Sequence, residues 1–264
     1  MISSKAYIDT TILTDALLKQ DSQGDTARNA FKNYSETILP VYAIKEFQAG
    51  PLQYHIWLHD KLALTKSLKM TPLDAVNAII GYQKNRAKTS LHALTSLLAA
   101  GTSRAMTDEE LADLFRMATA GLIIRAWNKR RRLTSSVTDE LSCYPETDPK
   151  IVMRTGLFAK SRKIYRLYGT EECCMANSLK KRGNDLELLM HALDGLTRRE
   201  DTNRRGVLRK LWRTPKQPMD ARDCVKLGDA FFALHAPADS VILTTNVKDH
   251  MHLANALGKQ AVSP

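Results

Sequence analysis

Four carboxylates lie where short apolar segments of the chain end, or on the apolar segments that follow them. They are Asp9, Glu46, Asp229 and Asp249, two near each end of the sequence. Carboxylate oxygens brought together from such positions form a site suited to Mg²⁺ or Mn²⁺, which prefer hard oxygen ligands. A divalent cation held in this way activates water for hydrolysis of a phosphodiester bond. The four acids are therefore the first candidates for chemistry.

The segments that carry these acids predict an α/β fold. Apolar runs over residues 5–9, 37–39 and 241–244 predict short buried strands, and helical patterns follow each of them. Alternation of strands and helices implies a parallel sheet. Ligands of such sheets bind at the carboxyl ends of the strands, where Asp9 and the residues around Asn246 are expected to lie.

Four segments, in this order, resemble the PIN-domain family of metal-dependent ribonucleases, and in particular the VapC-type toxins. They are residues 7–18 (YIDTTILTDALL), 38–47 (ILPVYAIKEF), 227–236 (LGDAFFALHA) and 242–250 (ILTTNVKDH). The resemblance implies a central parallel sheet flanked by helices. It also implies a catalytic set with Mg²⁺ or Mn²⁺ as cofactor: Asp9, Glu46, Asp229 and Asp249, with Asn246 as a further metal ligand or as the alternative to Asp249.

Two features depart from the family pattern. His250 follows Asp249 where the family has an aromatic residue, and the stretch between Glu46 and Asp229 is much longer than in the family. We therefore expect a discontinuous PIN-like nuclease core, residues 1–53 and 222–264. Residues 54–221 would be a large, basic and mostly α-helical insertion, with an irregular connector over residues 134–150. His250 and His252 predict a surface helix start, with a metal-binding His-x-His pair as the alternative.

The net charge of +11 is concentrated in the second half of this insertion. Between residues 150 and 226 basic residues outnumber acidic ones roughly two to one, which is typical of a protein that binds a polyanion. The pattern predicts nucleic-acid contacts, with the indole of Trp212 stacking on a base. The alternative is a set of solvated helix faces. The candidate residues are Lys129, Arg130, Arg131, Arg132, Arg198, Arg199, Arg204, Arg205, Arg209, Lys210 and Trp212.

Composition limits the class and the location of the protein. The chain contains no apolar run long enough to span a membrane, and no secretory signal precedes the first strand. The four cysteines, Cys143, Cys173, Cys174 and Cys224, lack the spacing of a zinc site and predict reduced thiols. A cytoplasmic protein with no membrane partner is expected.

Two classes of function follow. The first is a metal-dependent endoribonuclease that cleaves RNA, with tRNA or another structured RNA as the target. The toxin resemblance implies a toxin or defence effector, an antitoxin or other regulatory protein as partner, and a homo-oligomer as one assembly. The alternatives are a non-catalytic nucleic-acid-binding or assembly protein on a PIN-like scaffold, and a deoxyribonuclease of the same architecture.

Overall fold

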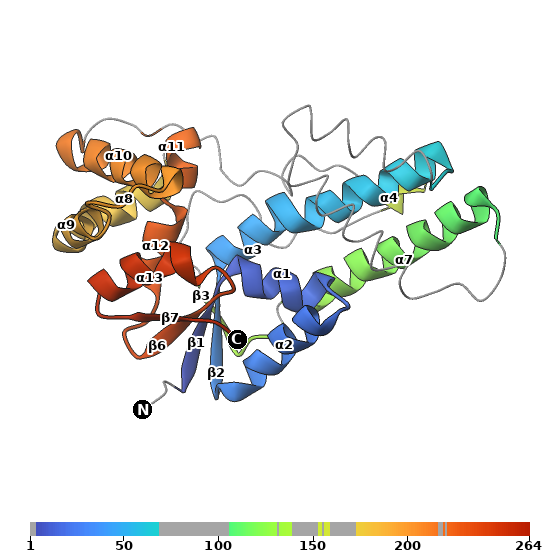
Figure 1. The fold of residues 1–264 in the computed structure, drawn as a ribbon, viewed down its shortest axis with the longest axis horizontal. Helices are drawn as coiled ribbons and strands as arrows, with labels where there is room; N and C mark the ends of the chain where they lie inside the picture. Colours follow the sequence, from blue (N-terminus) through green and yellow to red (C-terminus); the bar gives the residue numbers. More distant parts are fainter. Residues whose placement is uncertain are drawn as a thin grey trace.

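The protein is an α/β protein built on a five-stranded parallel sheet, shown in the computed structural model of Figure 1. The structure describes residues 4–68, 106–130, 132–138, 153–154, 156–158, 173–215, 219 and 221–264. The strand order is β3-β2-β1-β6-β7, and a separate antiparallel pair, β4 with β5, lies outside this sheet. The strands are β1 (Lys5–Ile8), β2 (Glu36–Pro40), β3 (Ser136–Thr138), β4 (Met153–Arg154), β5 (Leu157–Phe158), β6 (Ser240–Leu243) and β7 (Gln260–Val262).

Helices cover the sheet and extend beyond it. In Figure 1, α1 and α2 lie on one side of the strands, and α12 and α13 lie on the other. The α-helices are α1 (Thr10–Leu18), α2 (Ser22–Ala30), α3 (Val41–Phe47), α4 (Gln53–Thr65), α7 (Asp108–Lys129), α8 (Cys174–Lys181), α9 (Gly183–Ala192), α10 (Arg199–Arg213), α11 (Ala221–Lys226), α12 (Gly228–His235) and α13 (Val247–Ala256). A 3₁₀ helix, η1 (Phe31–Asn33), adjoins α2, and a π-helix, η2 (Gln48–Leu52), adjoins α4. No helix among these described residues is both long enough and apolar enough to cross a membrane.

The central strand β1 explains why distant parts of the chain meet. Tyr7 lies opposite Ile38 of β2 and Ile242 of β6, and all three side chains are buried. The ring of Tyr7 packs on Phe232 of α12, with 4.6 Å between the ring centroids. Because strands buried on both faces are apolar throughout, the predicted strands were recognisable in the sequence, and the structure confirms all three.

The predicted insertion is not only helical. Its residues 136–138, expected in an irregular connector, form the edge strand β3 and pair with β2. Val137 supplies a β-branched residue opposite Leu39, which favours strand pairing there. The sequence of residues 71–101 predicts a further helix of the insertion, with Pro72 at its first position. This segment and the candidate Arg131 lie outside the described residues.

Two long helices of the insertion, α4 and α7, lie side by side and project from the body of the protein (Figure 1). Thr107 begins α7 with a capping box, in which its hydroxyl accepts from the backbone N–H of Glu110 and the Glu110 carboxylate accepts from the backbone N–H of Thr107. Leu58 and Leu62 of α4 pack with Phe115 of α7 in a small apolar cluster separate from the main core.

Helix α10 corrects a second expectation from the sequence. The basic sequence of residues 200–220 predicts a loop or a short helix with a mobile end, but Arg199–Arg213 is one continuous helix. Its apolar residues Val207, Leu208 and Leu211 are buried, whereas its basic residues mostly face outwards. The amphipathic spacing, rather than the charge, determines the helix.

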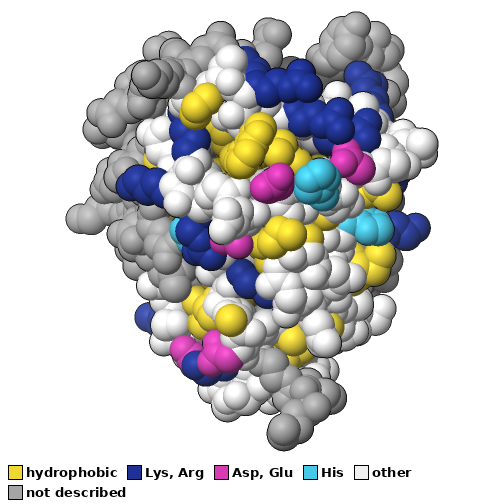
Figure 2. Space-filling view, turned by 90° about the vertical axis from the view of Figure 1, so that its left-hand side faces the viewer, with side chains coloured by type: hydrophobic (Ala, Val, Ile, Leu, Met, Phe, Trp, Pro, Cys, Tyr) yellow, Lys and Arg dark blue, Asp and Glu magenta, His cyan; other side chains and the backbone are white. Residues whose placement is uncertain are grey.

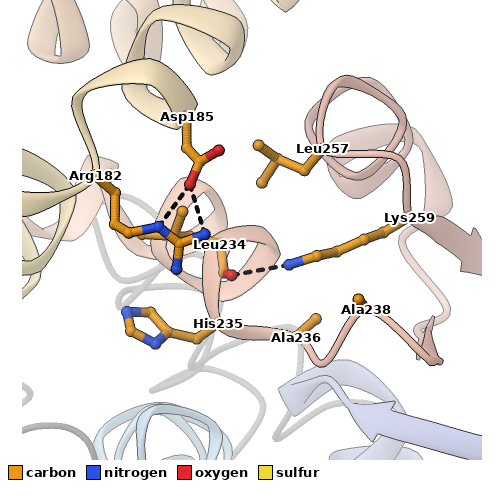
Figure 3. A pocket seen from close by; sticks show the side chains of 8 residues that line it. All are labelled: Arg182, Asp185, Leu234, His235, Ala236, Ala238, Leu257 and Lys259. Carbon is orange, nitrogen blue, oxygen red and sulfur yellow. Dashed lines mark hydrogen bonds and ion pairs between the residues drawn. The ribbon is translucent and has the colours of Figure 1, made fainter.

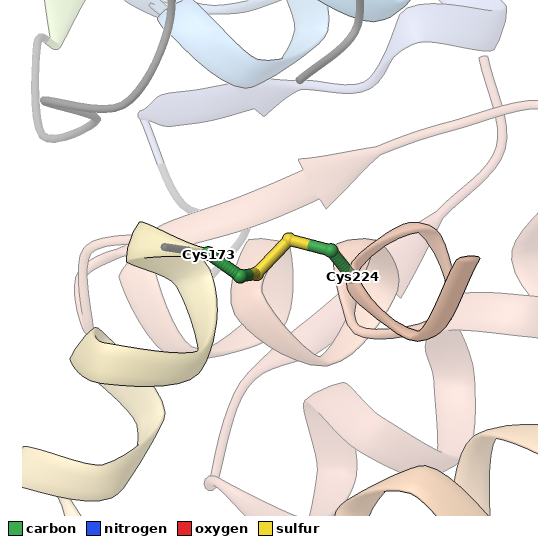
Figure 4. Close-up of a disulfide and its surroundings, with 2 residues drawn as sticks. All are labelled: Cys173 and Cys224. Carbon is green, nitrogen blue, oxygen red and sulfur yellow. A yellow bond between two sulfur atoms is a disulfide. The ribbon is translucent and has the colours of Figure 1, made fainter. Parts of the chain in front are cut away.

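A disulfide joins Cys173, immediately before α8, to Cys224 of α11 (Figure 4). Helices α8 and α11 both pack beside α12, which brings the two Cα atoms to 6.0 Å, within the range that a disulfide spans. The expectation of reduced thiols is therefore wrong for this pair. Spacing in the sequence could not reveal the pairing, because 51 positions separate the two cysteines.

A close approach at the start of α12 predicts a sensitive position. A Cβ atom at Gly228 would overlap the hydroxyl of buried Tyr42. We expect Gly228→Ala to lower the free energy of unfolding by about 1–3 kcal/mol, because an overpacked core shifts rigid side chains. Gly206→Ala is the matched control, because Gly206 is exposed on α10 and nothing lies within 4 Å of its Cβ position. We expect this change to raise the free energy of unfolding by up to about 1 kcal/mol, since Ala favours a helix more than Gly does. Urea unfolding measures the free energy of unfolding of the two variants. An equal change in Gly228→Ala and Gly206→Ala would contradict the prediction.

Candidate active site

Asp9 lies at the carboxyl end of β1, between the ends of β2 and β6. It caps α1 by accepting from the backbone N–H of Thr11, and its Oδ2 accepts from the hydroxyls of Thr11 at 2.6 Å and Thr244 at 2.7 Å. Only 4% of the residue is exposed. Asp9 therefore has two roles in the structure: it caps α1, and it faces the sheet edge at which a ligand would bind.

His250 of α13 is the partner of Asp9. Its Nε2 lies 3.6 Å from Asp9 Oδ2, and its ring packs beside Phe232 with 3% of the residue exposed. Burial by itself would raise the pKa of Asp9, but the His250 charge and the hydroxyl hydrogen bonds lower it to about 2. Burial likewise opposes the charge on His250, but Asp9 raises its pKa to about 9. The two residues therefore form a buried ion pair.

Glu46 lies on α3, which follows β2, and faces the same edge. Its Oε2 accepts from the hydroxyl of Thr10 at 2.5 Å. Burial, followed by the negative charges of Asp9 and Asp229, raises the pKa of Glu46 to about 7. Asp9 and Asp229 are therefore each close enough to disfavour the negative charge of Glu46.

Asp229 is paired with Arg204 of α10, and Asp249 is paired with Arg198, the N-cap residue that precedes this helix. Asp229 is in the first turn of α12, and its Oδ2 accepts from Arg204. Asp249 is in the first turn of α13, and its Oδ1 lies 2.8 Å from a terminal nitrogen of Arg198. Its Oδ2 accepts from the side-chain amide of Asn246, which is exposed at the start of α13.

Asp201 connects the two arginines. Only 2% of this residue is exposed, and its carboxylate accepts from Arg198 Nε at 2.6 Å and from Arg204 at 3.1 Å. The hydrogen bond and charge of Arg198, together with the charge of Arg204, lower the pKa of Asp201 against the effect of burial. A continuous chain of charges, Asp249–Arg198–Asp201–Arg204–Asp229, results.

The predicted acids are thus brought to one edge of the sheet, but not into one coordination shell. No three acidic or histidine side chains among the described residues are grouped closely enough to hold a metal ion. The donor chemistry nevertheless fits a hard divalent cation, since Asp9, Glu46 and Asp229 supply carboxylate oxygens whose mutual repulsion a cation would relieve. Arginine and histidine supply the positive charge in this conformation.

The candidate nucleic-acid residues divide into exposed and interior groups. Arg204 is buried in the charge chain, and Arg130 is buried with its guanidinium 3.7 Å from the centre of the Trp127 ring. These two therefore do not belong to an exposed basic surface. The exposed or partly exposed ones are Lys129, Arg132, Arg198, Arg199, Arg205, Arg209, Lys210 and Trp212.

Three residues at the site were not among the predicted catalytic and metal-ligating residues: His250, Thr244 and Asp201. His250 was expected on the surface, but its buried position beside Asp9 follows from the turn of α13 over Phe232. Its place directly after Asp249, where the resemblance leads one to expect an aromatic ring, was the available signal. Thr244 had no signal, because its hydroxyl bonds Asp9 from a segment 235 positions away in the chain. Asp201 bonds Arg198 and Arg204, three positions to either side, so helical spacing was the available signal for it.

A pocket lies at the C-terminal end of α12, away from Asp229 (Figure 3). It has a volume of about 360 Å³ and is lined by residues that include Arg182, His235 and Lys259. The amine of Lys259 donates to the backbone carbonyls of Ala233 and Leu234. Burial and the charge of Arg182 lower the pKa of Lys259 to about 8. Because this amine caps the end of α12, it stabilises the helix.

His235 in this pocket predicts a pH dependence of stability. Burial and the charge of Lys259 lower its pKa to about 4 from the ordinary 6.5, and its Nε2 is hydrogen-bonded to the Ser178 hydroxyl at 2.7 Å. The neutral ring contributes fully above pH 6.5, and this contribution is lost as the pH falls through 4. Urea midpoints of wild type should therefore fall more steeply between these pH values than those of His235→Gln. Parallel pH profiles of the two proteins would contradict this.

No protein-family model matches the chain, and neither a search of curated proteins nor one of solved structures finds a match. The structure itself shows an α/β protein with a cluster of carboxylates at the carboxyl edge of a parallel sheet, two of which are paired with arginines.

Proposed function

We propose that the protein is a metal-dependent endoribonuclease with a PIN-like core, residues 1–53 and 222–264, and a basic insertion, residues 54–221. The observation that carries the proposal is the position of Asp9, Glu46 and Asp229. They lie at the carboxyl edge of the sheet, close enough for Asp9 and Asp229 to raise the pKa of Glu46 to about 7. Repulsion between carboxylates is kept in proteins where a function requires it, and the four motifs supply the resemblance to this class of nuclease.

Asp9, Glu46 and Asp229 would hold Mg²⁺ or Mn²⁺, with Asn246 or Asp249 as a further ligand. The cation would supply the positive charge that activates water and neutralises the leaving oxygen of the phosphodiester. Thr11 and Thr244 fix the Asp9 carboxylate by donating to its Oδ2. Thr10 orients Glu46, whose carboxylate can take up a proton near neutral pH.

The exposed side of α10 is the proposed RNA-binding surface. Arg199, Arg209 and Arg213 are exposed on it, and Trp212 has 45% of its surface exposed. Figure 2 shows Lys and Arg side chains gathered over the upper part of this face of the protein, above a pair of acidic and histidine side chains. Basic groups bind phosphates and an exposed indole stacks on bases, so this surface suits single-stranded or looped RNA.

The biological setting is part of the proposal. We propose a toxin or defence effector that acts on tRNA or another structured RNA in the cytoplasm and is held inactive by an antitoxin or another regulatory protein. A reducing cytoplasm would leave Cys173 and Cys224 as thiols, whereas the structure joins them in a disulfide, and disulfides are rare in reducing compartments. Alkylation of Cys173 and Cys224 in freshly lysed cells therefore tests the location: labelled thiols support the cytoplasm, and a linked pair opposes it.

Cleavage of RNA by purified protein tests the activity. Wild type should cut RNA with Mg²⁺ or Mn²⁺ and stop with EDTA, and Asp9→Asn should be slower by about 10³-fold, since a catalytic cation is worth several kcal/mol. Asp25→Asn is the matched control, because Asp25 is exposed on α2 away from the site. Cleavage that continues in EDTA, or equal rates for wild type and Asp9→Asn, would exclude the proposal. Faster cleavage of DNA than of RNA would assign a deoxyribonuclease.

A second candidate function is favoured by one observation. Asp229 and Asp249 already have arginine partners, so the acids could serve only to stabilise the fold of a non-catalytic nucleic-acid-binding or assembly protein. Such a protein would bind RNA through α10 and show no turnover with either cation. RNA affinity that is equal in wild type and in an Asp9→Asn/Asp229→Asn variant, without cleavage, would establish this alternative.

A further inference from the structure

Helix α10 reaches the acidic cluster from outside the predicted nuclease core. Arg204 pairs with Asp229 of α12, and Arg198, the N-cap residue of α10, pairs with Asp249 of α13. The helix and its N-cap thus neutralise two of the four candidate acids. The pairs differ in exposure: 8% of the Arg204 side chain is exposed, but 40% of that of Arg198 is. Charge from the insertion therefore occupies the same oxygens that a cation would need.

Asp201 makes these pairs exchangeable. It lies on α10 itself and accepts from both arginines, through Oδ2 and Oδ1 for Arg198 and through Oδ1 for Arg204. An arginine that leaves Asp229 or Asp249 would keep Asp201 as its partner and would not become an unpaired buried charge. The cost of releasing the core acids is thereby reduced, because the large penalty falls on buried charges left without a partner.

We propose that α10 is an internal counter-ion helix, whose Arg198 and Arg204 compete with a divalent cation for Asp249 and Asp229 while Asp201 retains them. This inference rests on the proposed metal-dependent function and adds a means of regulation within the same chain. A partner protein or an RNA that binds the exposed side of α10 would change the metal affinity through this helix.

The network predicts changes of opposite sign in metal affinity. Removing a competing arginine should tighten Mn²⁺ binding, by about tenfold for Arg204→Gln and by less for the more exposed Arg198→Gln. Asp201→Asn should weaken it, because the arginines then have only Asp229 and Asp249 as carboxylate partners in this network. If α10 only supported the fold, all three changes would weaken binding.

The measurement is the affinity of the 264-residue chain for Mn²⁺ in the absence of RNA. Electron paramagnetic resonance follows the concentration of free Mn²⁺. Arg116→Gln is the charge-matched control, because Arg116 pairs with Asp113 on α7, remote from the acids. Arg198→Gln keeps the test decisive if Arg204→Gln does not fold, since Arg198 is the more exposed of the two.

The outcomes separate the inference from the function on which it rests. Tighter binding by Arg198→Gln or Arg204→Gln, with weaker binding by Asp201→Asn, supports the counter-ion helix. Binding by wild type that is lost in Asp9→Asn but unchanged or weaker in both arginine variants overturns the inference and leaves the nuclease proposal intact. Absence of Mn²⁺ binding in wild type and in every arginine variant overturns both.

Discussion

Replacing His250 with Phe is expected to lower the free energy of unfolding of the metal-free protein by about 3–5 kcal/mol. The Phe ring could still pack beside Phe232, so the loss would come from charge and not from volume. Asp9 would remain buried next to Thr11 and Thr244 with no cation at 3.6 Å from its Oδ2. Removing one member of a buried ion pair leaves the other uncompensated, which costs more than the pair contributes.

A double-mutant cycle separates this charge effect from packing. His250→Phe/Asp9→Asn should recover most of the lost stability, because neither residue then carries an unpaired charge. Urea unfolding at pH 6 in EDTA is the measurement, since His250 and Asp9 are both charged there, with pKa values of about 9 and 2. Additive effects of the two substitutions would show that the pair contributes nothing.

Removing the Cys173–Cys224 disulfide by substituting Ala at both positions is expected to lower the free energy of unfolding of the oxidised protein by about 4 kcal/mol. The chain-entropy estimate for a cross-link that spans 51 positions gives this size. The bond ties α8 to α11, which precedes α12 and its Asp229, so the same change should loosen this side of the site. Thermal or urea unfolding of the oxidised proteins checks the prediction.

Peptide mapping and thiol alkylation test directly whether Cys173 and Cys224 are linked. Proteolysis of the oxidised wild type without reductant should release peptides linked through Cys173 and Cys224. Complete alkylation of both thiols in the folded, oxidised protein would show that the bond does not form. The predictions for His250→Phe and for removal of the disulfide concern the stability of the structure around the acids. Neither depends on nuclease activity.

Glu46 is the acid of the cluster without its own counter-charge among the described residues. Asp9 has His250, while Asp229 and Asp249 have Arg204 and Arg198. The pKa of Glu46 is raised by burial and by the negative charges of Asp9 and Asp229, which outweigh the hydrogen bond from Thr10 and the positive charge of His250. The site therefore carries one carboxylate that is poised between its charged and neutral forms at physiological pH.

The sequence by itself determined the strands and the edge at which the acids lie. Short apolar runs such as residues 5–8 and 240–243 predict buried strands of a parallel sheet, and parallel strands place their carboxyl ends together. Asp9 follows the first run directly, so its position needed only local pattern and general topology. Asp229 followed from an apolar helix pattern in the same way.

Only the tertiary structure showed which charged side chains and which cysteines are in contact. The contacts of Asp9 with His250, of Asp229 with Arg204 and of Cys173 with Cys224 join segments that pack through the sheet and α12, and periodicity carries no information about such pairings. Arg204 and Arg209 are both arginines of one basic helix, yet the turn of α10 buries the first and exposes the second. A side chain's role in the site thus depends on the face its helix turns inward, which packing of Val207, Leu208 and Leu211 determines.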